Sequence, residues 1–179
     1  MSQLYHYTTG AKWREIQKEA KLIPIGRLIV DVLGIPQPER RDAGNGAIWG
    51  FQEMEPKSWL ENEEFPYIFG KLLCKTGYSD GVVILRVNLS SDYQPQVFDW
   101  AQIERDKNPD GVAHSSWRKY WESRLPLDQY QKEYSLPEIV IRKEVGLERI
   151  SLVQEINPED TQRKFEKHLR LYREFNERL

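Results

Sequence analysis

His6 is the first residue of this chain whose type suggests chemistry. It lies between Tyr5 and Tyr7 in the segment LYHYTT, whose side chains alternate with the period of two that is typical of a strand. A buried imidazole nitrogen needs a hydrogen-bond partner, because leaving it unpaired away from water is costly. Two interpretations follow from the residue types: His6 is satisfied by a neighbour in the fold, or it faces a ligand.

Glu138 is the second candidate, at the start of the run EIVI. Taken alone, an acidic residue in this position is more often structural than catalytic. The histidines His6, His114 and His168 fall on different predicted elements, which disfavours a histidine-rich metal site. Cys74, inside the apolar FGKLLCKT, is expected to pack as a small hydrophobic side chain rather than to attack a substrate. The sequence also lacks GxxxxGK[ST], GxGxxG, GxSxG and HExxH motifs.

The composition places limits on the class of protein. The 179 residues, 39% hydrophobic and 30% charged, predict one globular domain over 1–179, and the single cysteine excludes an internal disulfide and fits a reducing cytoplasm. No stretch approaches the ~20 apolar residues of a membrane span, and no secretory signal is recognised. The net charge of −2 gives the whole molecule no basic field for polyanions.

The elements that would position these residues can be read from periodicity and capping signals. A strand over QLYHYT is followed by a helix over residues 10 to 20, capped by Thr8 or Thr9, with Trp13, Ile16 and Ala20 as its apolar stripe and Pro24 and Gly26 as its end. Residues 24–50 read as a long turn-rich connection with one brief strand, of the kind that is often functional. A second helix is predicted through EFPYIFGKLLCKT, then a turn over 77–81 and a strand in DGVVILRVNL.

The second half reads as helices followed by strands and a last helix. Residues 97 to 131 are predicted to hold a short helix near WAQIER, a break at KNPDG and a helix over HSSWRKYWESRL that ends at Pro126. Two β-rich runs, 138–141 and 149–153, follow around a charged turn. A C-terminal helix over 158–179, capped by Asn157, is expected to dock through Phe165, Leu169, Tyr172, Phe175 and Leu179. This order favours an α+β fold with a mixed or antiparallel sheet.

Two segments resemble motifs of the ADP-ribosyltransferase superfamily. LYHYTTGAKWREIQKEAKLIP is similar to its first motif, a strand with His-x-Thr followed by a helix, although the glycine usual before the exit is replaced within EAKLIP. YSLPEIVIRKEVGLERISLV is similar to its acidic motif, a Glu at the start of a strand, then a turn and a last strand. The likeness is closest to the His-Tyr-Glu branch, which has DNA-targeting ADP-ribosyltransferase toxins and RNA 2′-phosphotransferases as neighbours.

The resemblance implies an ADP-ribosyltransferase-like split sheet with surrounding helices and a cleft that holds NAD as substrate. His6 would bind a ribose hydroxyl, Thr8 would help to seat the nicotinamide, and Glu138 would be the catalytic carboxylate. A carboxylate suits this task, because departure of nicotinamide leaves an oxocarbenium-like sugar. His6 and Glu138 would then meet across one crevice.

The middle of the chain offers less specific candidates. Trp49, Phe51, Trp59, Tyr67 and Phe69 are the aromatic residues that would stack on the nicotinamide, and Tyr67 is chosen because it follows the long loop on a predicted helix; core packing explains any single one equally well. Arg27 is chosen to bind the pyrophosphate, with Arg40 and Arg41 as alternatives, since a guanidinium fork suits phosphate oxygens. Loop arginines are also ordinary solvent-exposed residues.

The resemblance leaves several functions open. Leu136 stands where another branch has a Glu or Gln two positions before the catalytic Glu, which disfavours transfer to arginine. A mono-ADP-ribosyltransferase that modifies nucleic acid or another macromolecule is expected, as a bacterial toxin with an antitoxin partner or as a phage-defence effector. Arg118, Lys119 and Arg124 would supply a local basic patch. The alternatives are an RNA 2′-phosphotransferase-like enzyme and a catalytically silent protein-binding domain.

Overall fold

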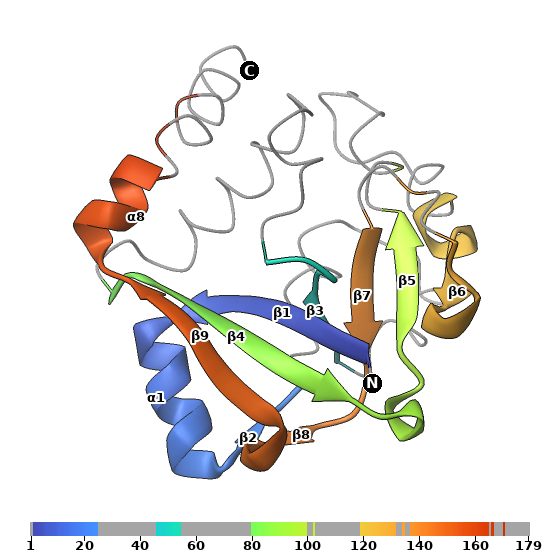
Figure 1. Cartoon of the computed structure of the whole chain (residues 1–179), viewed down its shortest axis with the longest axis horizontal. Helices are drawn as coiled ribbons and strands as arrows, with labels where there is room; N and C mark the ends of the chain where they lie inside the picture. Colours follow the sequence, from blue (N-terminus) through green and yellow to red (C-terminus); the bar gives the residue numbers. More distant parts are fainter. Residues whose placement is uncertain are drawn as a thin grey trace.

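The computed structural model describes residues 2–24, 46–54, 80–99, 102, 119–131, 134, 137–164, 166 and 170. These residues form an α+β arrangement in which every described strand pair is antiparallel (Figure 1). The prediction of an α+β fold with antiparallel sheet is therefore confirmed at this level. The described part of the chain contains no helix with the length and apolar character needed to span a bilayer.

The first sheet has the order β1-β4-β9. β4 (Val82–Leu89) is its central strand, between β1 (Ser2–Thr9) and β9 (Ile150–Ile156). The valines and leucines of β4 are buried, as expected for β-branched and apolar residues in a strand paired on both sides. The pairing of β4 with β9 shifts register between Ile84 and Leu85, which leaves Val153 without a partner in the ladder and marks a bulge.

The second sheet has the order β3-β7-β5-β6. β7 (Pro137–Ile141) lies between β3 (Ile48–Gly50) and β5 (Gln96–Asp99), and β6 (Leu125–Pro126) pairs with the far edge of β5. The strand order does not follow the sequence order, so β7 inserts between two strands that precede it in the chain. Figure 1 shows the strands of this sheet running across the direction of β1 and β4.

The two sheets are joined where β1 meets the end of β3. Tyr5 and Phe51 exchange two backbone hydrogen bonds, of 2.8 and 3.0 Å. Tyr7 adds a hydrogen bond from its hydroxyl to the carbonyl of Met54 and an edge contact with the Phe51 ring. Gly50 permits this close approach, because a Cβ atom there would lie 2.1 Å from the carbonyl oxygen of Tyr5.

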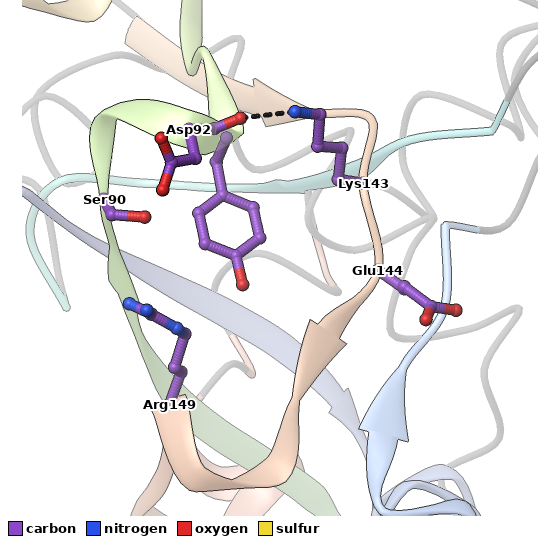
Figure 2. Close-up of a pocket in the computed structure, with 6 residues that line it drawn as sticks. Ser90, Asp92, Lys143, Glu144 and Arg149 are labelled. Atoms are coloured by element: carbon purple, nitrogen blue, oxygen red, sulfur yellow. Dashed lines mark hydrogen bonds between the residues drawn. The ribbon is translucent and has the colours of Figure 1, made fainter.

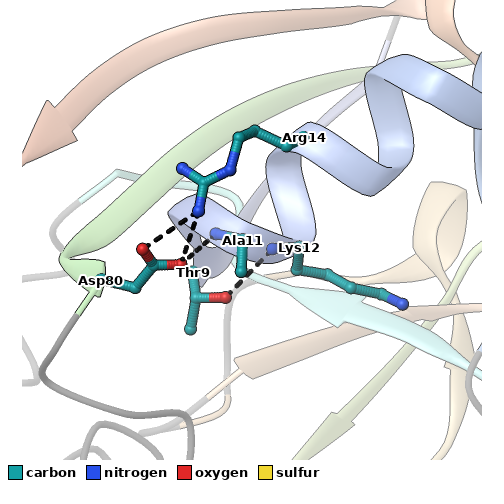
Figure 3. A network of polar contacts seen from close by, with 5 residues as sticks. All are labelled: Thr9, Ala11, Lys12, Arg14 and Asp80. Atoms are coloured by element: carbon teal, nitrogen blue, oxygen red, sulfur yellow. Dashed lines mark hydrogen bonds and ion pairs between the residues drawn. The ribbon is translucent and has the colours of Figure 1, made fainter.

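Helix α1 (Gly10–Glu19) follows β1 directly, and two side chains bind its first turn (Figure 3). Thr9 is the N-cap and accepts a hydrogen bond of 3.2 Å from the amide of Lys12, as predicted. Asp80 accepts a hydrogen bond from the amide of Ala11 and an ion pair of 3.1 Å from Arg14. An acidic group is favourable here, because it faces the positive end of the helix dipole.

The predicted helix over residues 10 to 20 is confirmed to within one residue at its end. Ala20 caps the helix with left-handed backbone angles and is exposed, so it does not belong to the apolar stripe in which it was placed with Trp13 and Ile16. Strand β2 (Lys21–Leu22) follows at once and pairs with β8 (Val145–Gly146). Leu22 is buried in this short pairing, and Ile16 is the buried apolar residue of the helix.

The hydrophobic core draws on both sheets and on α1. Its largest fully buried members come from β1, β3, β4, β5 and β7: Leu4, Ile48, Ile84, Leu85, Val83, Val87, Val97, Phe98, Ile139 and Ile141. Three short 3-10 turns connect the strands around it: η2 (Ser91–Tyr93), η3 (Leu127–Gln129) and η4 (Leu147–Arg149). Helix α8 (Pro158–Lys164) comes last, and Asn157 accepts a hydrogen bond of 2.8 Å from the amide of Asp160, as predicted.

The segment 97–131 contains two strands that the sequence does not predict. Residues 96–99 form β5, and Leu125 and Pro126 form β6 rather than the end of a helix, since helical structure stops at residue 122. The predicted helix through EFPYIFGKLLCKT, most of the predicted helix near WAQIER and the apolar stripe of the C-terminal helix lie outside the described residues.

Candidate functional site

Glu138 is a buried acid on β7, an inner strand of the second sheet. It is the second residue of β7, and its side chain is 4% exposed. It points to the face of β7 opposite Ile139 and Ile141, because successive side chains of a strand alternate. Phe98 of β5 is its cross-strand partner on this face. A buried carboxyl group on an otherwise apolar strand requires a specific partner.

Tyr120 is that partner. Its hydroxyl group donates a hydrogen bond of 2.5 Å to Oε2 of Glu138, and its ring stacks on Phe98 with 4.8 Å between ring centres. Burial raises the pKa of Glu138 to about 7, and the hydrogen bond from Tyr120 lowers it by a smaller amount. Burial, then the charge of Glu138, raises the pKa of Tyr120 well above its ordinary value. The phenol therefore stays protonated and donates, while Glu138 exchanges its proton near neutral pH.

His6 is held by the backbone of β3. Its Nδ1 lies 2.8 Å from the carbonyl oxygen of Trp49, and the two rings meet edge to face at 5.6 Å. A carbonyl only accepts, so Nδ1 carries the proton in this contact. Partial burial lowers the pKa of His6, and the contact with Trp49 raises it by less. The neutral ring leaves Nε2 as an acceptor, and Nε2 has no partner among the described residues.

His6 and Glu138 lie on the two sides of β3 and share no hydrogen bond. Trp49 contacts His6 on one side and pairs with Val140 of β7 on the other. With strands about 4.8 Å apart and a rise of about 3.4 Å per residue, the Cα atom of Glu138 lies about 8 Å from that of Trp49. On β1, His6 pairs with Leu85 and shares the face of Leu4. The structure thus places His6 and Glu138 on opposite sides of β3, without a direct contact between them.

Of the other predicted site residues, the structure describes Thr8 and leaves Tyr67 and Arg27 outside the described residues. Thr8 is half-buried on β1, on the same face as His6, and pairs with Val83 of β4. Its neighbour Thr9, not Thr8, caps the helix. Tyr67 and Arg27 lie outside the described residues, as do Trp59, Phe69, Arg40 and Arg41.

Tyr120 is the residue that sequence reasoning missed. Its helical position was predicted, but nothing in KYWES distinguishes a tyrosine that caps a buried acid from one that packs in a core. The contact with Glu138 joins residues 18 positions apart and depends on how the helical turn at 119–122 lies over β5 and β7. No local pattern reports such a contact.

Two arginines surround the next residue of this turn. The guanidinium carbon of Arg124 lies 4.8 Å from the centre of the Trp121 ring, and that of Arg142 lies 5.2 Å from it. Trp121 also contacts Phe98, at 5.7 Å. These cation–π contacts place two positive charges beside the aromatic residues that cover Glu138.

A separate cavity of about 460 Å³ lies at the other end of β7 (Figure 2). It is lined by Ser90, Asp92, Tyr93, Lys143, Glu144 and Arg149. Lys143 donates a hydrogen bond of 2.6 Å to the carbonyl of Asp92, and Glu144 forms an ion pair of 2.9 Å with Lys21. The first contact ties the turn after β7 to the turn after β4, and the second ties it to β2. No group of three or more potential ligands for a metal ion occurs among the residues that the structure describes.

The described residues define an α+β protein with two larger antiparallel sheets and the two-stranded sheet of β2 and β8. A buried carboxyl–phenol pair lies at the four-stranded sheet, and a neutral histidine lies on the three-stranded sheet. No protein-family model, curated protein or solved structure matches the chain.

Proposed function

We propose that the protein is an NAD-dependent mono-ADP-ribosyltransferase in which Glu138 is the catalytic carboxyl group. The observation that carries the proposal is the environment of Glu138: a buried acid at the start of a strand, held by Tyr120, with a pKa of about 7. Acids perturbed in this way by burial and a specific partner occur preferentially at functional sites.

The chemistry asks two things of Glu138. When the bond between C1′ of the ribose and the nicotinamide nitrogen breaks, the electron pair leaves with nicotinamide, and an ionised carboxylate stabilises the positive charge on the sugar. The acceptor nucleophile then bonds to C1′ and loses a proton, which the same carboxylate can take. A pKa of about 7 suits both steps, because a base is most effective when its pKa is close to the working pH.

The surroundings of Glu138 support the same assignment. The hydrogen bond from Tyr120 fixes the orientation of Oε2, so less reorganisation is needed when charge develops nearby. The apolar face formed with Phe98 limits the access of water, which strengthens the electrostatic interaction of the carboxylate with the sugar.

His6 and Trp49 would bind the ribose and the nicotinamide side of the dinucleotide. The lone pair on Nε2 of His6 accepts a hydrogen bond from a ribose hydroxyl, while Nδ1 anchors the ring to β3. The indole of Trp49 meets the His6 ring edge to face and is half-buried, so it offers an aromatic surface for stacking. The two larger sheets meet through the bridge between Tyr5 and Phe51, and His6 and Trp49 lie along this junction. This arrangement is compatible with the split sheet that the sequence resemblance implies.

The cellular role belongs to the same proposal. We infer a cytoplasmic effector, either a toxin held in check by an antitoxin protein or a phage-defence enzyme, with nucleic acid as the acceptor.

The test is release of nicotinamide from NAD, measured by chromatography for the wild-type protein, Glu138→Gln and Glu144→Gln. Glu144 is a matched control, since it is an exposed acid six residues further along the chain and pairs only with Lys21 on the surface. We expect turnover by the wild type and by Glu144→Gln, and a loss of at least a hundredfold in Glu138→Gln, which is the order of a general-base contribution.

Equal turnover in the two variants would remove Glu138 from the reaction. Absence of NAD cleavage by the wild type, with nucleic acid supplied as acceptor, would reject the transferase. In that case, transfer of a 2′-phosphate from RNA to NAD would identify the phosphotransferase alternative, and inactivity in both assays would favour a protein-binding domain.

A further inference from the structure

The cavity at the far end of β7 is lined by a serine whose hydroxyl group has no partner. Ser90 stands directly after β4, at the residue that precedes η2, and its side chain makes no capping hydrogen bond there. Its Oγ atom is buried and has no hydrogen-bond partner among the residues that the structure describes. A buried hydroxyl without a partner is unfavourable, because it has given up its hydrogen bonds to water. A ligand bound in the cavity that Ser90 lines would supply the missing partner.

Arg149 brings a positive charge to the same cavity. It is the last residue of η4, and the pairing of Val87 with Ile150 places it beside the end of β4. Its guanidinium carbon lies 5.6 Å from the centre of the Tyr93 ring, in a cation–π contact. The guanidinium group forms no hydrogen bond or ion pair with the residues that the structure describes. Its N–H donors are therefore available to a ligand, while the contact with Tyr93 limits the positions that the side chain adopts.

The charges that face the cavity favour an anion. Lys143 is a second cation: its Nζ donates one hydrogen bond, of 2.6 Å, to the carbonyl of Asp92 and has two further N–H donors. Glu144 is turned away from the cavity toward β2, where it pairs with Lys21 (Figure 2). The two cations, Arg149 and Lys143, therefore face one carboxylate, that of Asp92. The lining keeps one net positive charge, which a bound anionic group would balance.

We propose that this cavity binds a small molecule through an oxyanion group, a phosphate or a carboxylate, that Arg149 and Ser90 hold. A guanidinium fork pairs with two oxygens of such a group, and the serine hydroxyl donates to one of them. Figure 2 shows Ser90, Asp92 and Arg149 on the same side of the cavity. The volume of about 460 Å³ lies in the range of small-molecule sites.

This site is separate from the proposed transferase reaction. Glu138 is the second residue of β7, whereas Lys143 follows the last residue of the strand, so the two sites lie at opposite ends of β7. The inference therefore does not depend on NAD or on catalysis.

Binding measurements with two probes test the site and distinguish the two oxyanions. Inorganic phosphate and acetate are each titrated into the full chain at constant ionic strength. Proton–nitrogen NMR spectra follow the amides of residues 89–93 and the side-chain Nε–H of Arg149. The variants are Arg149→Ala, Ser90→Ala and Asp92→Asn, and the control is Arg163→Ala, an exposed arginine of α8 that pairs with Asp160. Circular dichroism verifies that each variant is folded.

We expect Arg149→Ala to bind the preferred probe about tenfold more weakly, the usual loss for a charge-assisted hydrogen bond, and Ser90→Ala to bind it several-fold more weakly. Asp92→Asn should bind it more tightly, because a repelling charge is removed. Arg163→Ala should bind as the wild type does. Tighter binding of phosphate than of acetate would identify a phosphate-bearing ligand, and the reverse order a carboxylate.

The stability of Ser90→Ala gives an independent readout. Without a ligand, the variant should unfold at the same urea concentration as the wild type or at a higher one, because the substitution removes an unpaired polar group. With a saturating concentration of the probe, the wild type should gain more stability than the variant. A loss of stability in the ligand-free variant would show that the hydroxyl already has a partner within the fold, and would overturn its role in the site.

Wild-type affinity of Arg149→Ala and Ser90→Ala for both probes would overturn the proposal, as would the failure of both probes to bind the wild type. Neither measurement involves NAD. Weakened binding in these variants together with an inactive wild type would retain the oxyanion site and reject the transferase, whereas an active enzyme whose wild type binds neither probe would do the reverse.

Discussion

The hydroxyl group of Tyr120 and the carboxyl group of Glu138 lie 2.5 Å apart, and both side chains are buried. The pair shares one proton donor, the phenol, whose own pKa is raised too far for it to ionise near neutral pH. The carboxyl group is consequently the member of the pair that changes charge. This relationship makes the protonation of Glu138 measurable through stability as well as through activity.

The stability of the protein should depend on pH through Glu138. Because folding raises the pKa of this group from 4.5 to about 7, its stabilising effect is complete below pH 4.5, falls as the pH rises and is lost above pH 7. The full effect corresponds to about 3 kcal/mol. Glu138→Gln removes it, so urea unfolding should show the variant gaining on the wild type by up to this amount between pH 5 and pH 8. An unchanged difference between the two proteins across this range would contradict the shift.

Removal of the Tyr120 hydroxyl should raise the pKa of Glu138 further. The hydrogen bond favours the ionised carboxylate, so Tyr120→Phe loses that contribution and leaves burial unopposed. Titration of the side-chain carboxyl carbon by NMR measures the change directly. Tyr93→Phe is the control, since Tyr93 lies in the cavity at the far end of β7, and its removal should leave the titration of Glu138 unaltered.

The imidazole of His6 should be neutral at pH 7 and protonated at Nδ1. Long-range proton–nitrogen correlation spectra report this tautomer, and titration should give a pKa below 6.5. A depressed pKa stabilises the fold above pH 6.5 and loses that effect as the pH falls through the folded value, the opposite trend to Glu138. Observation of the Nε2 tautomer would disprove the contact with Trp49.

Gly50→Ala should separate the two sheets. The new Cβ atom would lie 2.1 Å from the carbonyl oxygen of Tyr5 and 2.4 Å from Cδ1 of the buried Leu4, and the Tyr5 backbone cannot give way without breaking its pairing with Phe51. We expect a loss of about 3 kcal/mol or more in urea unfolding. Gly146→Ala is the matched control, because the three atoms nearest its Cβ would all belong to the flexible carboxylate of Glu148 and its φ of −65° suits alanine. A loss for Gly50→Ala as small as the one expected for Gly146→Ala would show that the junction tolerates a side chain.

The elements that carry a local sequence pattern, either an alternation of side chains or a helix cap, were predicted correctly. The alternation in LYHYTT and VVILRVNL, the Thr9 cap and the Asn157 cap all reappear in the structure, because each depends on residues within one or two turns. Strand β5 escaped notice because its residues Val97, Phe98 and Asp99 are all buried, so no alternation of polar and apolar positions marks it. The two-residue strand β6 is too short for any period.

Only part of the candidate site could be predicted from the sequence. The types of His6 and Glu138 drew attention to both residues, but their partners come from long-range packing. The carbonyl of Trp49 lies 43 residues from His6, and the phenol of Tyr120 is set against Glu138 by the placement of a helical turn over two strands. Pairing between distant strands is decided by the whole core and leaves no local signature.

The insertion of β7 between β3 and β5, and of β4 between β1 and β9, has a consequence for biosynthesis. As the nascent chain leaves the ribosome, β1 and β3 emerge long before the strands that will lie beside them. The three-stranded sheet lacks β9 and the four-stranded sheet lacks β7 until the β7–β9 region has been translated. Until then, the strands made earlier have unpaired edges. We expect newly made chains to depend on chaperones at this stage, and truncation before residue 137 to give a product that does not fold.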